Sequence, residues 1–179
     1  TILVRSSGEG IKGFGGKASG PAILIEGIEK IGEVIREREG KKLRSLDVLD
    51  ICNIIGSVVV AGNVRRSAEI ALFEYGLPEW EEFATAKKDW WIHDNAHRQQ
   101  SNNSLLFHSK PAREEIEHLF SMMLDSGGSE PGLINAQEAE RRAPWFKGCN
   151  PCAEILLGNK SFCNLTEVNV LAFKGDKNG

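Results

Sequence analysis

Apolar residues recur with a helical period along the first third of the chain. After Pro21, which suits a first helical turn, they step by four, three and four residues, at Leu24, Ile28, Ile31 and Ile35. Charged residues fill the intervening positions, so the pattern predicts an amphipathic helix that ends near Gly40. Ser45 is a suitable N-cap for a second helix, whose apolar residues are Leu46, Leu49, Ile54, Ile55 and Val58.

Short apolar runs between polar loops predict strands along the rest of the chain. We expect strands at 2–4, 68–73, 104–107 and 131–135, a short helix at 78–87 and a longer helix at 111–124. Strands that alternate with helices are typical of an α/β fold with a largely parallel sheet.

Composition indicates a soluble globular protein of about one domain. The chain has 179 residues, of which 41% are hydrophobic and 26% charged. A net charge of −3 argues against a sequence-independent nucleic-acid binder, which would carry a basic face. We find no signal peptide and no apolar run of membrane length, so we expect a cytoplasmic protein without membrane contact. In that compartment, neighbouring cysteines are more often catalytic or metal-binding than structural.

Candidate redox chemistry is concentrated in the last thirty residues, at Asn150, Cys152, Glu154 and Cys163. Pro151 disfavours a helix at the residue before it, and in an extended segment side chains two apart share a face. We therefore expect Asn150, Cys152 and Glu154 to point the same way. A sulfur atom there could lose and regain a hydrogen atom, and the carboxylate could take a proton from a substrate hydroxyl. A second thiol could close a disulfide that supplies two electrons.

Other interpretations of the cysteines remain open from the residues alone. Cys149 and Cys152 form a Cys-x-x-Cys pair, which in a thioredoxin-like site opens a long helix, although a Gly-Asn turn signal follows too soon at 158–159. A zinc site using all four cysteines is conceivable, but structural zinc sites usually present two local pairs. We expect Cys149 and Cys52 to be inert, with Cys52 packed as a small hydrophobe. The histidines lack metal-ligand spacing, so we predict no metal site.

At the motif around Cys152 the chain resembles the adenosylcobalamin-dependent (class II) ribonucleotide reductases. The resemblance implies a ten-stranded α/β barrel with a central finger loop. It implies that Cys152 becomes the thiyl radical that abstracts the ribose 3′ hydrogen, and that Glu154 deprotonates the 3′ hydroxyl. In the same comparison Asn150 hydrogen-bonds the substrate and Cys163 is one half of the reducing pair, whose other half we expect outside this chain.

A glycine-rich stretch at 8–20 precedes the first helix. Its Gly-x-Gly-x-x-Gly pattern would indicate a dinucleotide fold only if a helix opened at once after a strand, and here the helix waits until Pro21. It could be a flexible connection. Alternatively, backbone N–H groups around Ser19 and Gly20 could help to hold an anion at the positive end of the helix. The resemblance favours the second interpretation, with Ser19 and Gly20 close to a nucleotide.

Two further polar segments have both a structural and a functional interpretation. The adjacent arginines at 65 and 66 could lie in a solvated loop, but the run resembles the specificity loop of the reductases, and guanidinium groups suit contacts with phosphates and bases. That loop comprises Gly62, Asn63, Val64, Arg65 and Arg66, with Arg65 the preferred communicating residue. Ser101 to Ser104 could be a turn. The resemblance instead places Asn102, Asn103 and Ser104 near the active site.

The sequence thus predicts that residues 1–179 are an internal fragment of a reductase barrel, because the resemblance covers nearly the whole chain without the family's beginning or end. The resemblance implies reduction of ribonucleotides, with a preference for triphosphates, using adenosylcobalamin, a deoxynucleotide effector and a thioredoxin-like reductant. The alternatives are a diphosphate-reducing relative and a non-catalytic nucleotide-sensing module. We expect the 179-residue chain alone to be catalytically silent, since a partial barrel has open sheet edges.

Overall fold

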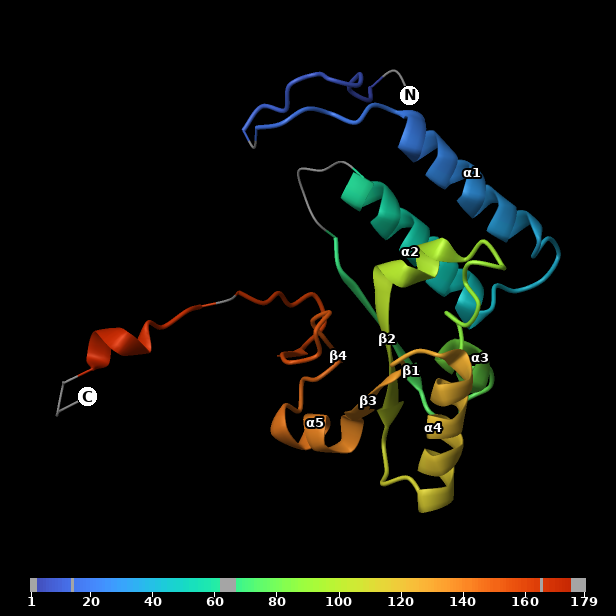
Figure 1. The fold of residues 1–179 in the computed structure, drawn as a ribbon, viewed down its shortest axis with the longest axis vertical. Coiled ribbons are helices and arrows are strands. Elements are labelled where there is room, and N and C mark those ends of the chain that lie inside the picture. The colour runs from blue at the N-terminus through green and yellow to red at the C-terminus, as the bar shows by residue number, and fades with distance from the viewer. Residues whose placement is uncertain (1–2, 14, 62–66, 165, 175–179) are drawn as a thin grey trace.

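The computed structural model describes all residues except 1–2, 14, 62–66, 165 and 175–179. Two long helices come first, followed by strands that alternate with helices and a small hairpin near the end (Figure 1). In chain order the elements are α1 (Ala22–Arg36), α2 (Ser45–Ala61), β1 (Glu69–Glu74), α3 (Trp80–Ala84), η1 (Ala96–Gln100), β2 (Ser101–Phe107), α4 (Arg113–Ser126), β3 (Gly132–Asn135), α5 (Ala136–Arg142), β4 (Gly148–Cys149), β5 (Leu156–Leu157) and η2 (Val170–Phe173).

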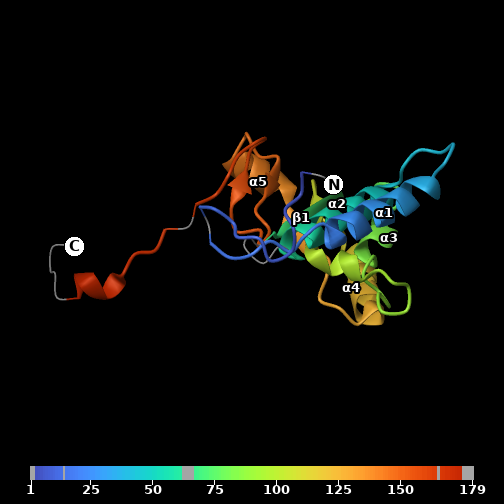
Figure 2. The ribbon, with the colours of Figure 1, turned by 90° about the horizontal axis from the view of Figure 1, so that it is seen from above.

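A three-stranded parallel sheet in the order β1-β2-β3 forms the centre of the molecule. Glu69 pairs with Ser101, and Ser104 pairs with Gly132, so β2 is bonded on both sides. Parallel strands need crossover connections, and these are supplied by α3 with η1 and by α4. Helices α2, α3 and α4 lie on one side of the sheet, whereas α5 and the β4–β5 hairpin lie on the other (Figures 1 and 2). We call these sides the helix face and the loop face.

The larger hydrophobic core lies on the helix face. Leu105 of β2 and Leu119 of α4 are completely buried there, and the Phe73 and Phe83 rings stack with centroids 5.1 Å apart. The other buried members of this core are Leu46, Leu49, Ala84, Ala86 and Phe107. Alternate residues of a strand face opposite sides, so β2 contributes Ser101, Asn103, Leu105 and Phe107 to this face.

Helix α2 is held in place from two directions. On the α1 side Gly27 lies so close to Val58 that a β-carbon at position 27 would collide with the valine side chain. On the other side the Asp50 carboxylate accepts hydrogen bonds from Arg98 Nε and Nη2 at 2.6 and 2.7 Å, and its Oδ1 lies 2.8 Å from His97 Nε2. Arg98 Nη1 also donates to the carbonyl of Ala86, so this buried ion pair joins three segments.

Most of the predicted elements are confirmed, with three differences. The strand expected at 2–4 is wrong for Leu3 and Val4, which form a turn and a bend; residues 1–2 lie outside the described part. Leu3 is 99% exposed, so it has no apolar surface to pack on. The short helix spans only Trp80–Ala84, and β2 begins three residues earlier than expected because its first residues are polar. Among the described residues no helix combines the length and apolarity needed to cross a membrane.

Candidate active site

Cys152 lies on a tight turn at the tip of the β4–β5 hairpin. Gly148 pairs with Leu157 and Cys149 with Leu156, which leaves residues 150–155 as the connection. The N–H of Ala153 donates to the carbonyl of Asn150 at 2.8 Å, so Pro151 and Cys152 are the two central residues of a four-residue turn. Proline is favoured at the first of these positions. Ala153 has a φ of 63°, a left-handed conformation that is uncommon for a residue with a β-carbon.

The turn corrects our expectation that Asn150, Cys152 and Glu154 share one face. Asn150 is only 6% exposed, and its Oδ1 accepts a hydrogen bond from the N–H of Ile155 at 2.9 Å. Cys152 and Glu154 are exposed instead. The alternation argument fails because it needs an extended backbone, and the proline supports a turn equally well. The asparagine oxygen thus stabilises the connection, while the thiol and the carboxylate are free to meet another molecule.

The hairpin is anchored to the loop face of the sheet by a second, smaller core. Its buried residues are Ala136, Ala139, Ala143, Phe146 and Cys149, packed against Ile70, Leu106, Ile134 and Leu156. A β-carbon at Gly148 would lie 3.5 Å from Leu72 Cδ1, which brings β4 against β1 as well. One side-chain hydrogen bond links the sheet to the turn itself: Asn102 Nδ2 donates to the carbonyl of Pro151 at 2.7 Å.

Cys149 does not have the properties of an activated thiol. It is 8% exposed on β4, and burial raises its pKa above the usual range for cysteine. A turn follows it, whereas a thioredoxin-like site needs a helix there. Within the described residues no three histidine, cysteine, aspartate or glutamate side chains gather as a metal site would require. The geometry therefore supports neither the thioredoxin-like nor the zinc interpretation.

Cys163 lies beyond β5 in a segment without regular secondary structure. This segment leads away from the sheet, and the thiol is exposed (Figure 1). Cys152 and Cys163 are both free cysteines, so the structure does not join the two thiols.

The segment at 101–104 lies on β2 and presents its side chains to both faces. Asn102 and Ser104 face the hairpin, as alternation along the strand requires. Asn103 points to the helix face, where its Oδ1 accepts a hydrogen bond from Ser101 Oγ at 2.8 Å. The Asn103 side chain therefore lies on the face opposite to Cys152, and the proximity of this segment to a nucleotide stays a prediction.

The glycine-rich stretch folds back on itself before α1. The N–H of Gly8 donates to the carbonyl of Ala18 at 2.9 Å, and the N–H of Ala18 donates to the carbonyl of Glu9 at 2.8 Å. Gly20 has a φ of 84°, and a β-carbon there would come within 3.0 Å of the Ser7 nitrogen. Ser19 and Gly20 line a hollow together with Arg5, next to an α1 N-terminus that has no side-chain cap.

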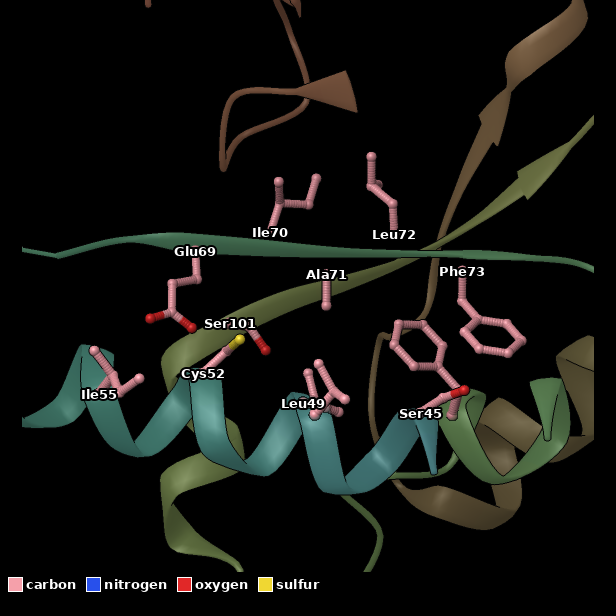
Figure 3. A pocket seen from close by; sticks show the side chains of 12 residues that line it. Ser45, Leu49, Cys52, Ile55, Glu69, Ile70, Ala71, Leu72, Phe73 and Ser101 are labelled. Atoms are coloured by element: carbon pink, nitrogen blue, oxygen red, sulfur yellow. The ribbon is translucent and has the colours of Figure 1, made fainter. Parts of the chain in front are cut away.

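The predicted specificity loop, Gly62, Asn63, Val64, Arg65 and Arg66, lies outside the described residues. Its flanks, α2 and β1, border a groove of about 680 Å³ (Figure 3). The Glu69 carboxylate and the Cys52 thiol both line this groove, and burial raises the pKa of Glu69. Cys52 is exposed there, so our expectation that it packs as a small hydrophobe is wrong; the helix surface around it has no cover among the described residues.

Two functional contacts could not be found from the sequence. The hydrogen bond from Asn102 to Pro151 joins residues 49 positions apart, and the contact of Asp50 with Arg98 spans 48. Neither pair has a local pattern that predicts its contact. For the contact of Asn102, the polar run at 101–104 indicated that the residue lies near the site, but it did not indicate which residue it contacts.

No protein-family model matches the chain, but curated relatives do. It is 42% identical over 179 residues to an adenosylcobalamin-dependent ribonucleoside-triphosphate reductase of Lactobacillus gasseri, a match that covers 92% of this chain and 23% of that protein. The reductase of the same name from Lactobacillus leichmannii is 38% identical over 178 residues, with the same coverage.

A solved structure matches as well. The crystal structure of a B12-dependent (class II) ribonucleotide reductase superimposes with a TM-score of 0.70 and 34% sequence identity, covering 87% of this chain and 22% of that one. The chain thus spans less than a quarter of the length of the proteins it matches. By sequence and by fold, it is homologous to a segment of the adenosylcobalamin-dependent (class II) ribonucleotide reductases.

Proposed function

We propose that this chain is part of the catalytic barrel of a ribonucleotide reductase, with Cys152 as the radical-carrying thiol. The observation that carries the proposal is the position of Cys152. Its thiol is exposed and free, on a turn that the Asn102 hydrogen bond holds over the loop face of a parallel sheet. In the proposed complete protein, further strands would continue the sheet beyond β1 and β3 into the ten-stranded barrel that the resemblance implies. The loop face would then be the barrel interior.

The side chains of the turn suit the proposed reaction. Loss of the Cys152 S–H hydrogen atom would leave a sulfur radical able to take the 3′ hydrogen of a ribose. The exposed Glu154 carboxylate is free to accept the proton of the 3′ hydroxyl. Asn150 Oδ1 already accepts a hydrogen bond from Ile155, and its Nδ2 group can donate one to the substrate. The 2′ hydroxyl would leave as water, with two electrons supplied as Cys163 and a second cysteine form a disulfide.

Adenosylcobalamin, when bound, would supply the initial radical. Cys152 fits this partner because a thiol that exchanges a hydrogen atom with a bulky cofactor must be free and accessible, and Cys152 is both. The names of the relatives, adenosylcobalamin-dependent ribonucleoside-triphosphate reductases, support the same cofactor and a ribonucleoside triphosphate substrate.

Nucleotide and reductant partners complete the proposal. The hollow formed by Arg5, Ser19 and Gly20 has the guanidinium and backbone N–H donors that suit a phosphate of the deoxynucleotide effector. Arg65 and Arg66 would connect that effector with substrate choice. A thioredoxin-like protein would reduce the disulfide after each turnover.

The direct test is Cys152→Ser in the complete reductase that carries this segment. Oxygen holds its hydrogen atom too tightly to relay a radical, so we expect turnover to be abolished while nucleotide binding is retained. Cys52→Ser is the matched control, because it changes an exposed thiol away from the hairpin. Cys163→Ser should stop multiple turnover but allow radical formation at Cys152. Sustained turnover of the Cys152 variant would overturn the assignment of the radical-carrying thiol to Cys152, whereas a wild-type protein that binds nucleotides without turnover would favour the nucleotide-sensing alternative.

A further inference from the structure

The hydrogen bond between Asn102 and the Pro151 carbonyl connects β2, the central strand of the sheet, to the turn that carries the thiol. Asn102 pairs with Ile70 of β1 in register, and two residues further along Ser104 pairs with Gly132 of β3. The asparagine side chain therefore projects from a strand that is held on both sides. Its Nδ2 lies 2.7 Å from the Pro151 oxygen, at the short end of the range for a hydrogen bond between neutral groups.

The acceptor is well placed to control the thiol. The Pro151 carbonyl belongs to the peptide unit that also contains the nitrogen of Cys152. Because a peptide unit is planar, holding this oxygen also holds the plane that contains the Cys152 nitrogen and α-carbon, which constrains the position from which the Cys152 side chain starts. The other hydrogen bonds of the turn, Ala153 to Asn150 and Ile155 to Asn150, close its base without fixing its orientation to the sheet.

We propose that Asn102 is a positioning residue that aims Cys152, and this inference rests on the proposed function. Asn102 does not touch the reacting atoms. Its effect is geometric, since hydrogen-atom transfer is sensitive to small displacements of the donor sulfur. The amide is required for its N–H group: a carboxylate of the same shape would place an acceptor against the carbonyl of Pro151.

The test in the complete reductase is Asn102→Asp together with Asn102→Ala. Misplacement of a reacting group by about 1 Å costs about 100-fold, so we expect kcat to fall by about 10- to 100-fold. KM for the ribonucleotide should change by less than about twofold, because the Asn102–Pro151 hydrogen bond binds no substrate. The aspartate variant should recover part of its kcat as the pH falls, since a protonated carboxyl can donate to the carbonyl again. Asn159→Asp, the same change at an exposed residue past β5, is the control.

A second measurement uses the 179-residue chain and does not depend on catalysis. Amide exchange at Ala153 and Ile155, both hydrogen-bonded within the turn, should accelerate several-fold in either Asn102 variant, while exchange in α4 stays unchanged. Unchanged exchange and an unchanged kcat would overturn the inference, as would a loss that appears mainly as a raised KM, or a kcat loss in the aspartate variant that does not diminish as the pH falls. If the wild-type protein reduces no ribonucleotide but exchange still accelerates in the Asn102 variants, the structural role of the Asn102 hydrogen bond is supported and the proposed function is wrong.

Discussion

The two faces of the central strand β2 are covered to different depths. On the helix face Ser101, Asn103, Leu105 and Phe107 are between 0 and 7% exposed. On the loop face Ser104 is only 5% exposed, but Asn102 is exposed and Leu106 is half-buried. Hydrophobic stabilisation grows with the apolar area removed from water, so the helix face contributes most of the folding free energy. Asn102 and Cys152 both lie exposed on the loop face.

The cores on the two faces differ in the same way. Aromatic rings and leucines fill the helix-face core, whereas three of the five buried residues of the loop-face core are alanines. On the loop face the hairpin is therefore held by small side chains and by the hydrogen bond from Asn102 to Pro151. We expect substitutions on the helix face to affect stability first, and substitutions on the loop face to affect chemistry first.

The largest effect on stability should come from Leu105→Ala. The side chain is fully buried in the centre of the sheet, so truncation should cost about 3–5 kcal/mol of unfolding free energy through lost burial and a residual cavity. Urea denaturation followed by circular dichroism measures this loss. Leu106→Ala is the matched control on the opposite face, and it should cost about 1–2 kcal/mol because the leucine is only half-buried. Equal losses would contradict the difference between the faces.

The next largest effect should follow Asp50→Asn. This change leaves the partly buried Arg98 without its carboxylate, and removing one partner of a largely buried pair costs up to about 3 kcal/mol. Equilibrium urea denaturation measures the loss. Glu117→Gln, which removes an exposed carboxylate from a similar ion pair, is the control and should change stability little. A loss no larger than that of the control would mean that the buried pair does not hold α2.

The same carboxylate makes stability depend on pH. Burial opposes ionisation of Asp50, but the hydrogen bonds from Arg98 and His97 outweigh it and lower the pKa of Asp50 below its ordinary value of 3.8. The unfolded chain therefore binds the proton more readily than the folded chain. The stabilisation from Asp50 is fully present above about pH 5 and is lost as the pH falls through 3.8 toward the folded pKa. The Asp50→Asn variant should lack this part of the acid dependence.

Local patterns in the sequence account for most of the fold. The period of apolar residues after Pro21 predicted α1, and the Pro131 run predicted β3, because both signals lie within a few neighbouring residues. The start of β2 was missed because Ser101 to Asn103 are polar, even though two of these residues are buried. Their burial is a property of the assembled sheet, which pairs that strand on both sides.

The residues of the candidate site stay a prediction from the sequence, and their geometry was not foreseen. The motif singled out Cys152 and Glu154, yet Pro151 is compatible with both an extended strand and a turn, and only the pairing of β4 with β5 decides between them. Long-range contacts such as that of Asn102 with Pro151 have no counterpart in local sequence. The predicted loop at 62–66 lies outside the described residues and stays a prediction.

A smaller effect on stability should separate the two cysteines of the hairpin. Cys149→Ser buries a hydroxyl in the loop-face core and should cost about 1–2 kcal/mol, whereas Cys152→Ser changes an exposed side chain and should cost less than about 0.5 kcal/mol. Thermal unfolding of both variants measures the difference. Alkylation of the folded wild type should be slower at Cys149 than at Cys152, since burial raises the pKa of Cys149. Equally fast alkylation would mean that the hairpin does not stay packed on the sheet.

The smallest effect should come from Arg113→Gln on the outer surface of α4. Arg113 Nε lies 2.7 Å from Glu117 Oε1, the same distance that joins Arg98 Nη2 to Asp50, but the Arg113 side chain is 86% exposed. Water screens such a pair, so its loss should change the unfolding free energy by less than about 0.5 kcal/mol. Two further effects favour the variant: a cation in the first turn opposes the helix dipole, and arginine before glutamate is the weaker order for a pair four residues apart. Urea denaturation at low and high salt checks this. A loss comparable to that of Asp50→Asn would show that short ion pairs stabilise this fold regardless of burial. It would contradict our expectation that exposed pairs contribute less to the unfolding free energy than buried ones.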